Sequence, residues 1–306
     1  MNDTRKPPGS YPAIWIRALR PWTVAVVAFP TTLGIVFADV AGREGRLKAA
    51  LVLVSAVLLQ FGANMVNHFF AFGSSGPDIG RTDIGVFGPG RSRIDWLVFL
   101  SGIGCFFLAI PFGMILVYLD GVPILLLGIV GFATAYFYSA EPVNYKRRGF
   151  AVPAAFLFLG LCMVAGSTYA VLERLPGRAL LISFPVGFLA AALLLEEELL
   201  GERRDRENGV GTLAVRLGPA RGRLLFLVLV VLAYLWPAVL NAASRVPHQS
   251  GLPIYFIYAA TPFAAASIRQ LYRSPALVKR PIPWMLLHHY VFGILYIAAN
   301  FSRGQR

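Results

Sequence analysis

Six acidic residues lie close together where a long apolar run ends, at Glu196, Glu197, Glu198, Glu202, Asp205 and Glu207. Three of them, Glu198, Glu202 and Asp205, are spaced i, i+4 and i+7, so they share one face if a helix continues through Gly201. Carboxylate oxygens suit Mg²⁺, which proteins usually hold with one or two carboxylates plus substrate phosphates. The pattern therefore predicts a magnesium site for a diphosphate. The alternative is a solvated acidic end that neighbouring arginines neutralise.

A stripe of amides interrupts another apolar run, at about 48–72. Gln60, Asn64, Asn67 and His68 are spaced i, i+4 and i+7/i+8, which places them on one face of a helix. Polar side chains at that depth are costly in lipid and tend to face the interior of a helix bundle. The stripe is therefore interpreted either as interhelical hydrogen bonding or as a surface that faces a substrate.

Basic and aromatic residues flank two further apolar stretches. They are Arg20-Pro21-Trp22-Thr23 at the start of one, and Tyr138-Ser-Ala-Glu141-Pro142 with Tyr145-Lys146-Arg147-Arg148 after the other. Each group alone is typical of an anchor for lipid headgroups. If both lie on the membrane side of the acidic cluster, they indicate binding of an anionic group such as a diphosphate.

The composition decides the class of protein that must position these residues. Of 306 residues, 57% are hydrophobic and only 14% are charged, and the mean hydropathy is +0.65. Soluble domains carry roughly 25% charged residues, so this chain is too apolar to be one. The net charge of +13 is interpreted as cytoplasmic loops that face anionic lipid, and not as a nucleic-acid surface. The sequence predicts an integral membrane protein.

The apolar stretches predict the membrane architecture. A membrane helix needs about 20 mostly apolar residues, and nine stretches qualify: about 22–41, 48–72, 96–119, 122–138, 150–172, 178–200, 222–243, 252–272 and 283–302. The connections are short, so we expect one transmembrane domain over residues 1–306. With the N-terminus in the cytoplasm, 20 of the 28 Lys and Arg residues lie inside, as the positive-inside rule requires. Nine spans then leave the C-terminus outside.

Two motifs carry a resemblance to a known family. The stretch Asp205-Arg-Glu-Asn-Gly209-Val-Gly-Thr212-Leu-Ala-Val-Arg216-Leu-Gly218 closely resembles the second signature of the UbiA superfamily of membrane prenyltransferases. It is most similar to the 1,4-dihydroxy-2-naphthoate polyprenyltransferases of menaquinone synthesis, whose fold has nine transmembrane helices. Asn64-Met-Val-Asn67-His68-Phe-Phe-Ala71 falls where the first signature lies. Weaker elements include the segments at Arg20, Tyr138 and Gly166-Ser-Thr-Tyr169.

The chain departs from both signatures at named positions. The family's first motif is Asn-Asp-x-x-Asp, whereas His68 and Ala71 stand here where the aspartates belong. The second motif has two aspartates four residues apart, and here the earlier position is Gly201 and the later one Asp205. Four acids lie close enough in the sequence to replace the missing ones: Asp78, Asp83, Glu198 and Glu202.

The resemblance implies a site and a reaction. Mg²⁺ would be held by Asp205 with Asp78, Asp83, Glu198 and Glu202, and it would bind an allylic diphosphate. Catalytic roles fall to Asp205, Asn67, Lys146 and Arg147, and substrate binding to Asn64, His68, Arg20, Arg204, Tyr138 and Tyr169. The prenyl group would alkylate an aromatic acceptor, with the tail in the apolar bundle and in contact with membrane lipid. We expect the inner (plasma) membrane of a bacterium.

Two functions remain open at this stage. The chain is either an active aromatic prenyltransferase with a rearranged acidic site, or a member of the superfamily that binds or carries an isoprenoid lipid without catalysis. The surviving acidic cluster favours the first function, and His68 and Ala71 favour the second.

Overall fold

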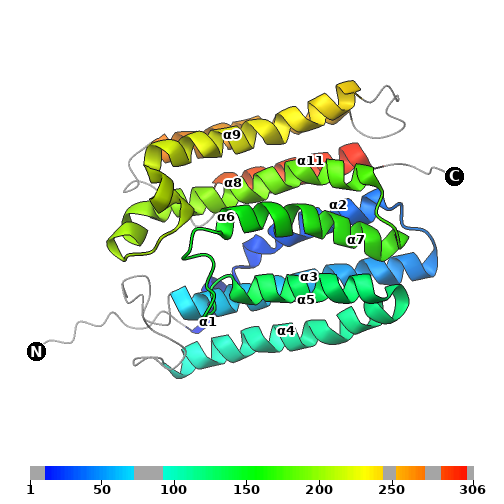
Figure 1. The fold of residues 1–306 in the computed structure, drawn as a ribbon, viewed down its shortest axis with the longest axis horizontal. Helices are drawn as coiled ribbons and strands as arrows, with labels where there is room; N and C mark the ends of the chain where they lie inside the picture. Colours follow the sequence, from blue (N-terminus) through cyan, green and yellow to red (C-terminus); the bar gives the residue numbers. More distant parts are fainter. Residues whose placement is uncertain (1–10, 72–91, 244–252, 273–283, 302–306) are drawn as a thin grey trace, which may run out of the picture.

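The fold is a bundle of long helices that run side by side (Figure 1). The computed structural model describes residues 11–71, 92–243, 253–272 and 284–301, and every regular element in those ranges is helical. Each of the nine apolar stretches coincides with a helical segment, so the predicted all-helical fold is confirmed. In the described ranges, six segments are long and apolar enough to cross a membrane.

The first segment differs from the predicted stretch at 22–41. Helix α1 (Tyr11–Leu19) precedes it, a short 3₁₀ turn η1 (Pro21–Thr23) follows, and α2 (Val24–Phe37) completes it. Arg20 separates α1 from η1 and adopts the left-handed conformation, with φ 48° and ψ 56°. The proline after Arg20 disfavours the right-handed helical conformation at Arg20, which explains the break.

Helices α3 (Gly42–Ala71), α4 (Arg93–Asp120) and α5 (Val122–Phe137) follow in the chain and pack as neighbours. The start of α4 is fixed by a capping box, in which Ser92 Oγ accepts from the Asp95 backbone and the Asp95 carboxylate accepts from the Ser92 N–H. Gly102 lets α4 approach α3 closely, because a Cβ atom there would lie 2.9 Å from Met65 Cβ.

The next rod changes its winding along its length. It consists of α6 (Ala151–Ala154), a π-helical segment η2 (Ala155–Cys162) and α7 (Met163–Leu172), and it packs against α8 (Gly177–Glu207). The two backbones touch, since a Cβ atom at Gly160 would lie 2.2 Å from Gly187 Cα. π-Helical segments are uncommon and often occur beside functional sites.

The last helices cover the other side of α8. They are α9 (Leu213–Ala243), which kinks at Gly218 and Pro219, then η3 (Ile254–Ala260), α10 (Thr261–Tyr272) and α11 (Trp284–Asn300). The main hydrophobic core joins α2, α8, α9 and α11. His288 and His289 of α11 are fully buried in it, and His288 Nε2 lies 2.7 Å from the Tyr234 hydroxyl.

The bundle has two distinct ends (Figure 1). One end, which we call the mouth end, carries the break at Arg20, the α5–α6 loop and the α8–α9 turn. The far end carries the α2–α3, α4–α5 and α7–α8 turns. There, buried Lys48 lies 2.6 Å from Asp120 Oδ1 and 2.7 Å from Glu173 Oε1, so ion pairs tie α3, α4 and the end of α7 together.

Candidate active site

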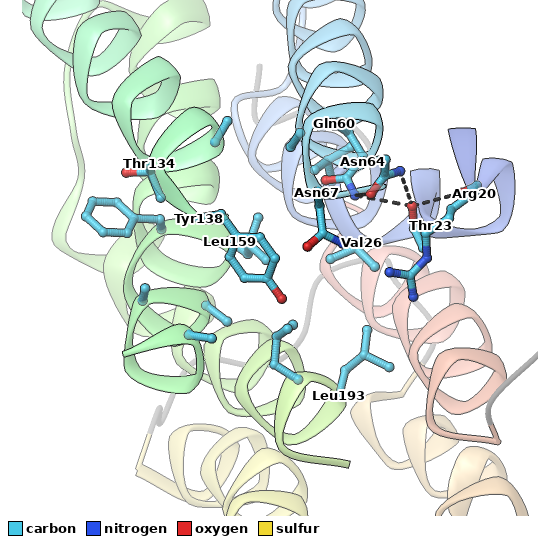
Figure 2. A pocket seen from close by; sticks show the side chains of 18 of the residues that line it. Arg20, Thr23, Val26, Gln60, Asn64, Asn67, Thr134, Tyr138, Leu159 and Leu193 are labelled. Carbon is cyan, nitrogen blue, oxygen red and sulfur yellow. Dashed lines mark hydrogen bonds between the residues drawn. The ribbon is translucent and has the colours of Figure 1, made fainter. Parts of the chain in front are cut away.

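A pocket of about 330 Å³ lies between α2, α3, α5, the α6–η2–α7 rod and α8 (Figure 2). Most of its wall is apolar, with Val26, Val27, Ala56, Leu59, Ala135, Phe158, Leu159, Met163 and Leu193 among its residues. Its polar residues are concentrated toward the mouth end and include Arg20, Asn64, Asn67, Tyr138 and Glu197. An apolar chamber with a polar mouth suits a ligand that has an apolar tail and a charged head.

The order of residues along α3 gives the depth of this pocket. Asn67 and Ala56 line its two limits on this helix, and at a rise of 1.5 Å per residue they are about 16 Å apart. Past Ala56, Leu51 is packed with Leu116, Ile124 and Ala170. This apolar cluster lies beyond the lining residues, toward the far end of the bundle.

A hydrogen-bond network fixes the segment that carries Arg20 (Figure 2). Asn64 Nδ2 donates to Thr23 Oγ1 and to the Leu19 carbonyl, both at 2.8 Å. Gln60 Nε2 donates to Thr23 Oγ1 at 3.2 Å, and Thr23 Oγ1 donates to the Arg20 carbonyl at 2.9 Å. The network joins α3 to both sides of the helix break, so the position of Arg20 is set by α3.

Asn67 has a different environment from Asn64. It is 3% exposed, it lines the pocket, and its carbonyl oxygen Oδ1 has no hydrogen-bond partner among the residues that the structure describes. Figure 2 shows its side chain directed into the space between α3 and Tyr138. Buried amide oxygens are normally satisfied, so this oxygen is available to a ligand.

Glu197 of α8 lines the pocket, and Gly201 and Asp205 follow it at i+4 and i+8, beyond the pocket wall. Glu197 Oε1 lies 3.5 Å from Arg20 Nη1, and the side chain of Glu197 is 42% exposed. A Cβ atom at Gly201 would lie 3.6 Å from Asp205 Oδ2, so the Asp205 carboxylate folds back toward Gly201. The sequence analysis named Glu197 in the acidic cluster but assigned it no role in the site, although its spacing to Asp205 was a readable signal.

Glu198 and Glu202 do not line the pocket. Helix α8 does continue through Gly201, as the predicted face required. However, Glu198 is 3% exposed and Glu198 Oε2 accepts from the Ala214 N–H at 3.1 Å, so it caps the first turn of α9. Glu202 forms an ion pair with Arg206 one turn later. The predicted triad of Glu198, Glu202 and Asp205 is therefore divided, because α9 packs on the side of α8 that Glu198 faces.

The α5–α6 loop brings a cation to the same acids. Lys146 Nζ lies 5.2 Å from the centre of the Tyr138 ring, and Lys146 acts electrostatically on both Glu197 and Asp205. Arg204 also acts on both acids, and its guanidinium lies 3.8 Å from Asp205 Oδ1. Arg147 instead lies 3.9 Å from Glu141 and outside the pocket wall.

Tyr138 stands between the acids and the chamber. Burial raises the pKa of its phenol well above the usual range, and Glu197 raises it further. The same cause raises the pKa of Tyr145, whose hydroxyl donates to the Thr134 carbonyl at 2.9 Å. Tyr138 is therefore a neutral hydroxyl at physiological pH and can donate a hydrogen bond into the pocket.

The other predicted site residues lie elsewhere. His68 is buried on α3 outside the pocket wall, and Tyr169 packs with the apolar cluster that lies beyond the lining residues. Tyr169 is thus about two turns beyond Met163 on the same rod. Asp78 and Asp83 lie outside the described residues.

The donor set at the mouth fits a hard cation. Among the described residues, no group of three or more His, Cys, Asp or Glu side chains could hold a metal alone. Mg²⁺ does not require such a group, since one or two carboxylates plus substrate phosphates suffice. Glu197 and Asn67 on the pocket wall, and Asp205 two turns after Glu197 on α8, supply oxygen atoms of the required kind.

Comparisons with known proteins agree in sequence and in fold. The chain matches the UbiA prenyltransferase family over residues 96–289. It is 30% identical over 237 residues to a 1,4-dihydroxy-2-naphthoate octaprenyltransferase from Mycobacterium leprae (strain TN), covering 76% of this chain and 79% of that protein. It is 27% identical to UbiA prenyltransferase domain-containing protein 1 from Xenopus tropicalis, covering 94% of this chain and 83% of that protein.

A solved structure of a UbiA homolog from Archaeoglobus fulgidus bound to GPP and Mg²⁺ has the same fold. The TM-score is 0.56 at 18% identity, and the match covers 94% of this chain and 98% of that one. The same homolog bound to Cd²⁺ matches with a TM-score of 0.62, also at 18% identity, over 94% of this chain and 97% of that one.

Proposed function

Since this chain belongs to the UbiA prenyltransferase family and is an integral membrane prenyltransferase, we propose that it transfers a polyprenyl group from an allylic diphosphate to an aromatic quinone precursor. The observation that carries this proposal is a pocket in which an apolar chamber about 16 Å deep ends at Arg20, Asn67 and Glu197. The chamber takes the prenyl tail and the mouth takes the diphosphate.

The cations at the mouth bind the diphosphate. Arg20 lies on the pocket wall, and Lys146 and Arg204 act on the acids beside it. Charge-assisted hydrogen bonds from these side chains stabilise the negative charge that grows on the diphosphate as it leaves. Tyr138 adds a neutral hydroxyl donor on the opposite wall.

Asp205, Glu197 and Asn67 are the described residues that would hold Mg²⁺. Asp78 and Asp83 are further candidates that lie outside the described residues. Bound there, the ion would supply Lewis-acid stabilisation of the diphosphate oxygens. Glu198 is not part of this proposed set, because its side chain is buried against α9 and its Oε2 caps that helix.

The reaction breaks the bond between the allylic carbon and the diphosphate oxygen, and the electron pair leaves with the diphosphate. The aromatic carbon of the acceptor then forms the new carbon–carbon bond, and the ring becomes aromatic again when that carbon loses a proton, or a carboxylate as CO₂, and the bonding electron pair stays in the ring. The walls around Val26, Leu159 and Leu193 exclude water from the allylic cation. This apolar lining favours transfer to the acceptor over hydrolysis.

The relatives support an acceptor of the naphthoate class and a place in menaquinone synthesis. A relative that is 30% identical is named a 1,4-dihydroxy-2-naphthoate octaprenyltransferase. We also propose that the protein lies in the bacterial inner membrane with its N-terminus in the cytoplasm. The mouth of the pocket then faces the cytoplasm, the compartment to which the positive-inside rule assigns Lys146 and Arg204.

Purified protein in lipid nanodiscs tests the function. The protein is incubated with Mg²⁺, 1,4-dihydroxy-2-naphthoate and radiolabelled prenyl diphosphates of different lengths, and prenylated product and released diphosphate are measured. Product that depends on both substrates supports the proposal. Binding of prenyl diphosphate without any product, at high Mg²⁺ and with several acceptors, favours a non-catalytic isoprenoid-binding protein, a function to which His68 and Ala71 in the first signature point.

A further inference from the structure

We propose that the ion pair between Arg20 and Glu197 couples the binding of diphosphate to the binding of Mg²⁺. Without ligands the two side chains form an ion pair with each other. The diphosphate takes the guanidinium of Arg20, which releases the carboxylate of Glu197 for the metal ion. The inference rests on the proposed function, since it assigns how the mouth of that same pocket takes its two charged ligands.

The first step of the argument is the geometry of the pair. Arg20 Nη1 and Glu197 Oε1 are 3.5 Å apart, and the two side chains are 26% and 42% exposed. A half-exposed pair of this kind is only weakly stabilising. Ligands of higher charge can therefore replace each partner without disrupting the fold.

The second step is that Arg20 is held by other contacts. Its backbone is fixed by the hydrogen bonds among Asn64, Thr23 and Gln60, none of which involves Glu197. Pro21 restricts Arg20 further. Loss of the ion pair consequently leaves the guanidinium at the pocket wall, where it can bind an anion.

The third step concerns the surroundings of Glu197 after its release. Asp205 lies two turns later on α8, and Lys146 and Arg204 act electrostatically on both Glu197 and Asp205. When a diphosphate engages these cations as well, the two carboxylates lose their counter-charges together. Two oxygen ligands with uncompensated charge are what a hard divalent cation requires.

This exchange makes the two ligands thermodynamically coupled. The factor by which bound diphosphate changes the affinity for Mg²⁺ must equal the factor by which bound Mg²⁺ changes the affinity for diphosphate. Substitutions that remove the charge of Glu197 or the charge of Arg20 are therefore expected to favour different ligands. Removal of the Glu197 charge frees Arg20 for diphosphate, and removal of the Arg20 charge frees Glu197 for metal.

Binding measurements on the full chain in nanodiscs test the coupling. Inorganic diphosphate is titrated by calorimetry in the presence of EDTA, and Mn²⁺ is titrated without diphosphate and followed by electron paramagnetic resonance. We expect Glu197→Gln to tighten metal-free diphosphate binding about two- to fivefold, the range that a half-exposed ion pair supports. Arg20→Gln should tighten Mn²⁺ binding by a similar factor and weaken diphosphate binding.

The chain offers a matched control on the same helix. Arg203 and Glu207 form an exposed ion pair at 2.9 Å outside the pocket wall. Glu207→Gln and Arg203→Gln should leave both titrations unchanged. Glu197→Ser serves as a second variant, and thermal unfolding of each variant verifies that it is folded.

The outcomes separate this inference from the proposed function. Opposite shifts in the two single variants support the coupling. If the wild-type protein binds diphosphate and Mn²⁺ but Glu197→Gln leaves metal-free diphosphate binding unchanged or weaker, the coupling is wrong and the proposed function stands. If the wild-type protein binds neither ligand, both are overturned.

Discussion

Asn67 lies one turn after Asn64 on α3, and there is a division of roles between the two amides. Asn64 uses its amide group inside the protein, donating to Thr23 Oγ1 and to the Leu19 carbonyl. Asn67 lies on the pocket wall, and its carbonyl oxygen has no partner within the described part of the chain. The first residue positions the segment around Arg20, and the second is open to a ligand.

The division predicts different defects for the two alanine variants. Asn64→Ala leaves the Leu19 carbonyl without its side-chain donor and is expected to lower the free energy of unfolding by about 1–3 kcal/mol. Asn67→Ala removes no internal hydrogen bond of its Oδ1 and should keep the wild-type stability while weakening Mg²⁺-dependent diphosphate binding. Unfolding in sodium dodecyl sulfate and calorimetry measure the two properties. Equal loss of stability in both variants would contradict the division.

The deep end of the pocket predicts a dependence on prenyl length. Ala56 lines the deep end, next to the apolar cluster that contains Leu51. Ala56→Phe should therefore shorten the chamber and lower kcat/KM for long prenyl diphosphates by about tenfold or more, because overpacking typically costs 1–3 kcal/mol. Dimethylallyl diphosphate should be affected least.

Val54→Phe provides the control for this prediction. Val54 lies on the same helix, is 40% exposed on the surface of the bundle and is not part of the pocket wall. It should leave the length preference unchanged. A uniform loss for all substrates in Ala56→Phe, without any change in preference, would argue against a tail in this chamber.

The position of Glu198 predicts a structural and not a metal-binding role. Glu198→Ala removes the acceptor of the Ala214 N–H and should lower stability by about 0.5–2 kcal/mol, as the loss of a helix cap does. Glu198→Gln keeps an acceptor oxygen and should be close to wild type. Mn²⁺ affinity at saturating diphosphate, measured for the folded variants, should not change in either. A loss of metal binding in Glu198→Gln would restore the role that the sequence predicted.

The positions of Glu197 and Glu198 on α8 show what could and could not be predicted from the sequence. Helical segments and their polar stripes follow from period and hydropathy, so the bundle and the asparagines on α3 were predictable. The acids were harder, because Glu197 and Glu198 are adjacent and differ by about 100° around the helix. Which of them faces the pocket depends on where α9 packs against α8, and that is a tertiary contact. The position of Tyr169 outside the pocket wall was unpredictable for the same reason, since only packing shows which end of its helix meets the chamber.

Topology is a prediction that the described structure leaves to experiment. The nine stretches and the charge distribution of 20 inside to 8 outside place the Lys146 loop in the cytoplasm and the C-terminus outside. Reporter fusions after Arg148 and after Arg306 should therefore report opposite sides of the membrane. Reports from the same side would mean that the number of spans is wrong by an odd number.

Gly201 occupies the position at which the family signature has its earlier aspartate, and the structure leaves room for that acid. A Cβ atom there would lie 3.5 Å from Arg204 Nη2 and 3.6 Å from Asp205 Oδ2, which is ordinary van der Waals contact. The neighbouring Arg204 and Lys146 would offset the added negative charge. Gly201→Asp should therefore fold normally and place a third acid on the face of Glu197 and Asp205.

We expect Gly201→Asp to tighten Mn²⁺ binding at saturating diphosphate about tenfold or more, the gain from one charge-assisted contact of about 1.5–3 kcal/mol. Gly201→Asn is the matched control, since it has nearly the same shape without the charge and should give a much smaller gain. Metal affinity is read by electron paramagnetic resonance, so the result does not depend on turnover. Equal affinities in the two variants would mean that the metal does not reach this face of α8, and Asp78 and Asp83 would then be the acids to substitute next.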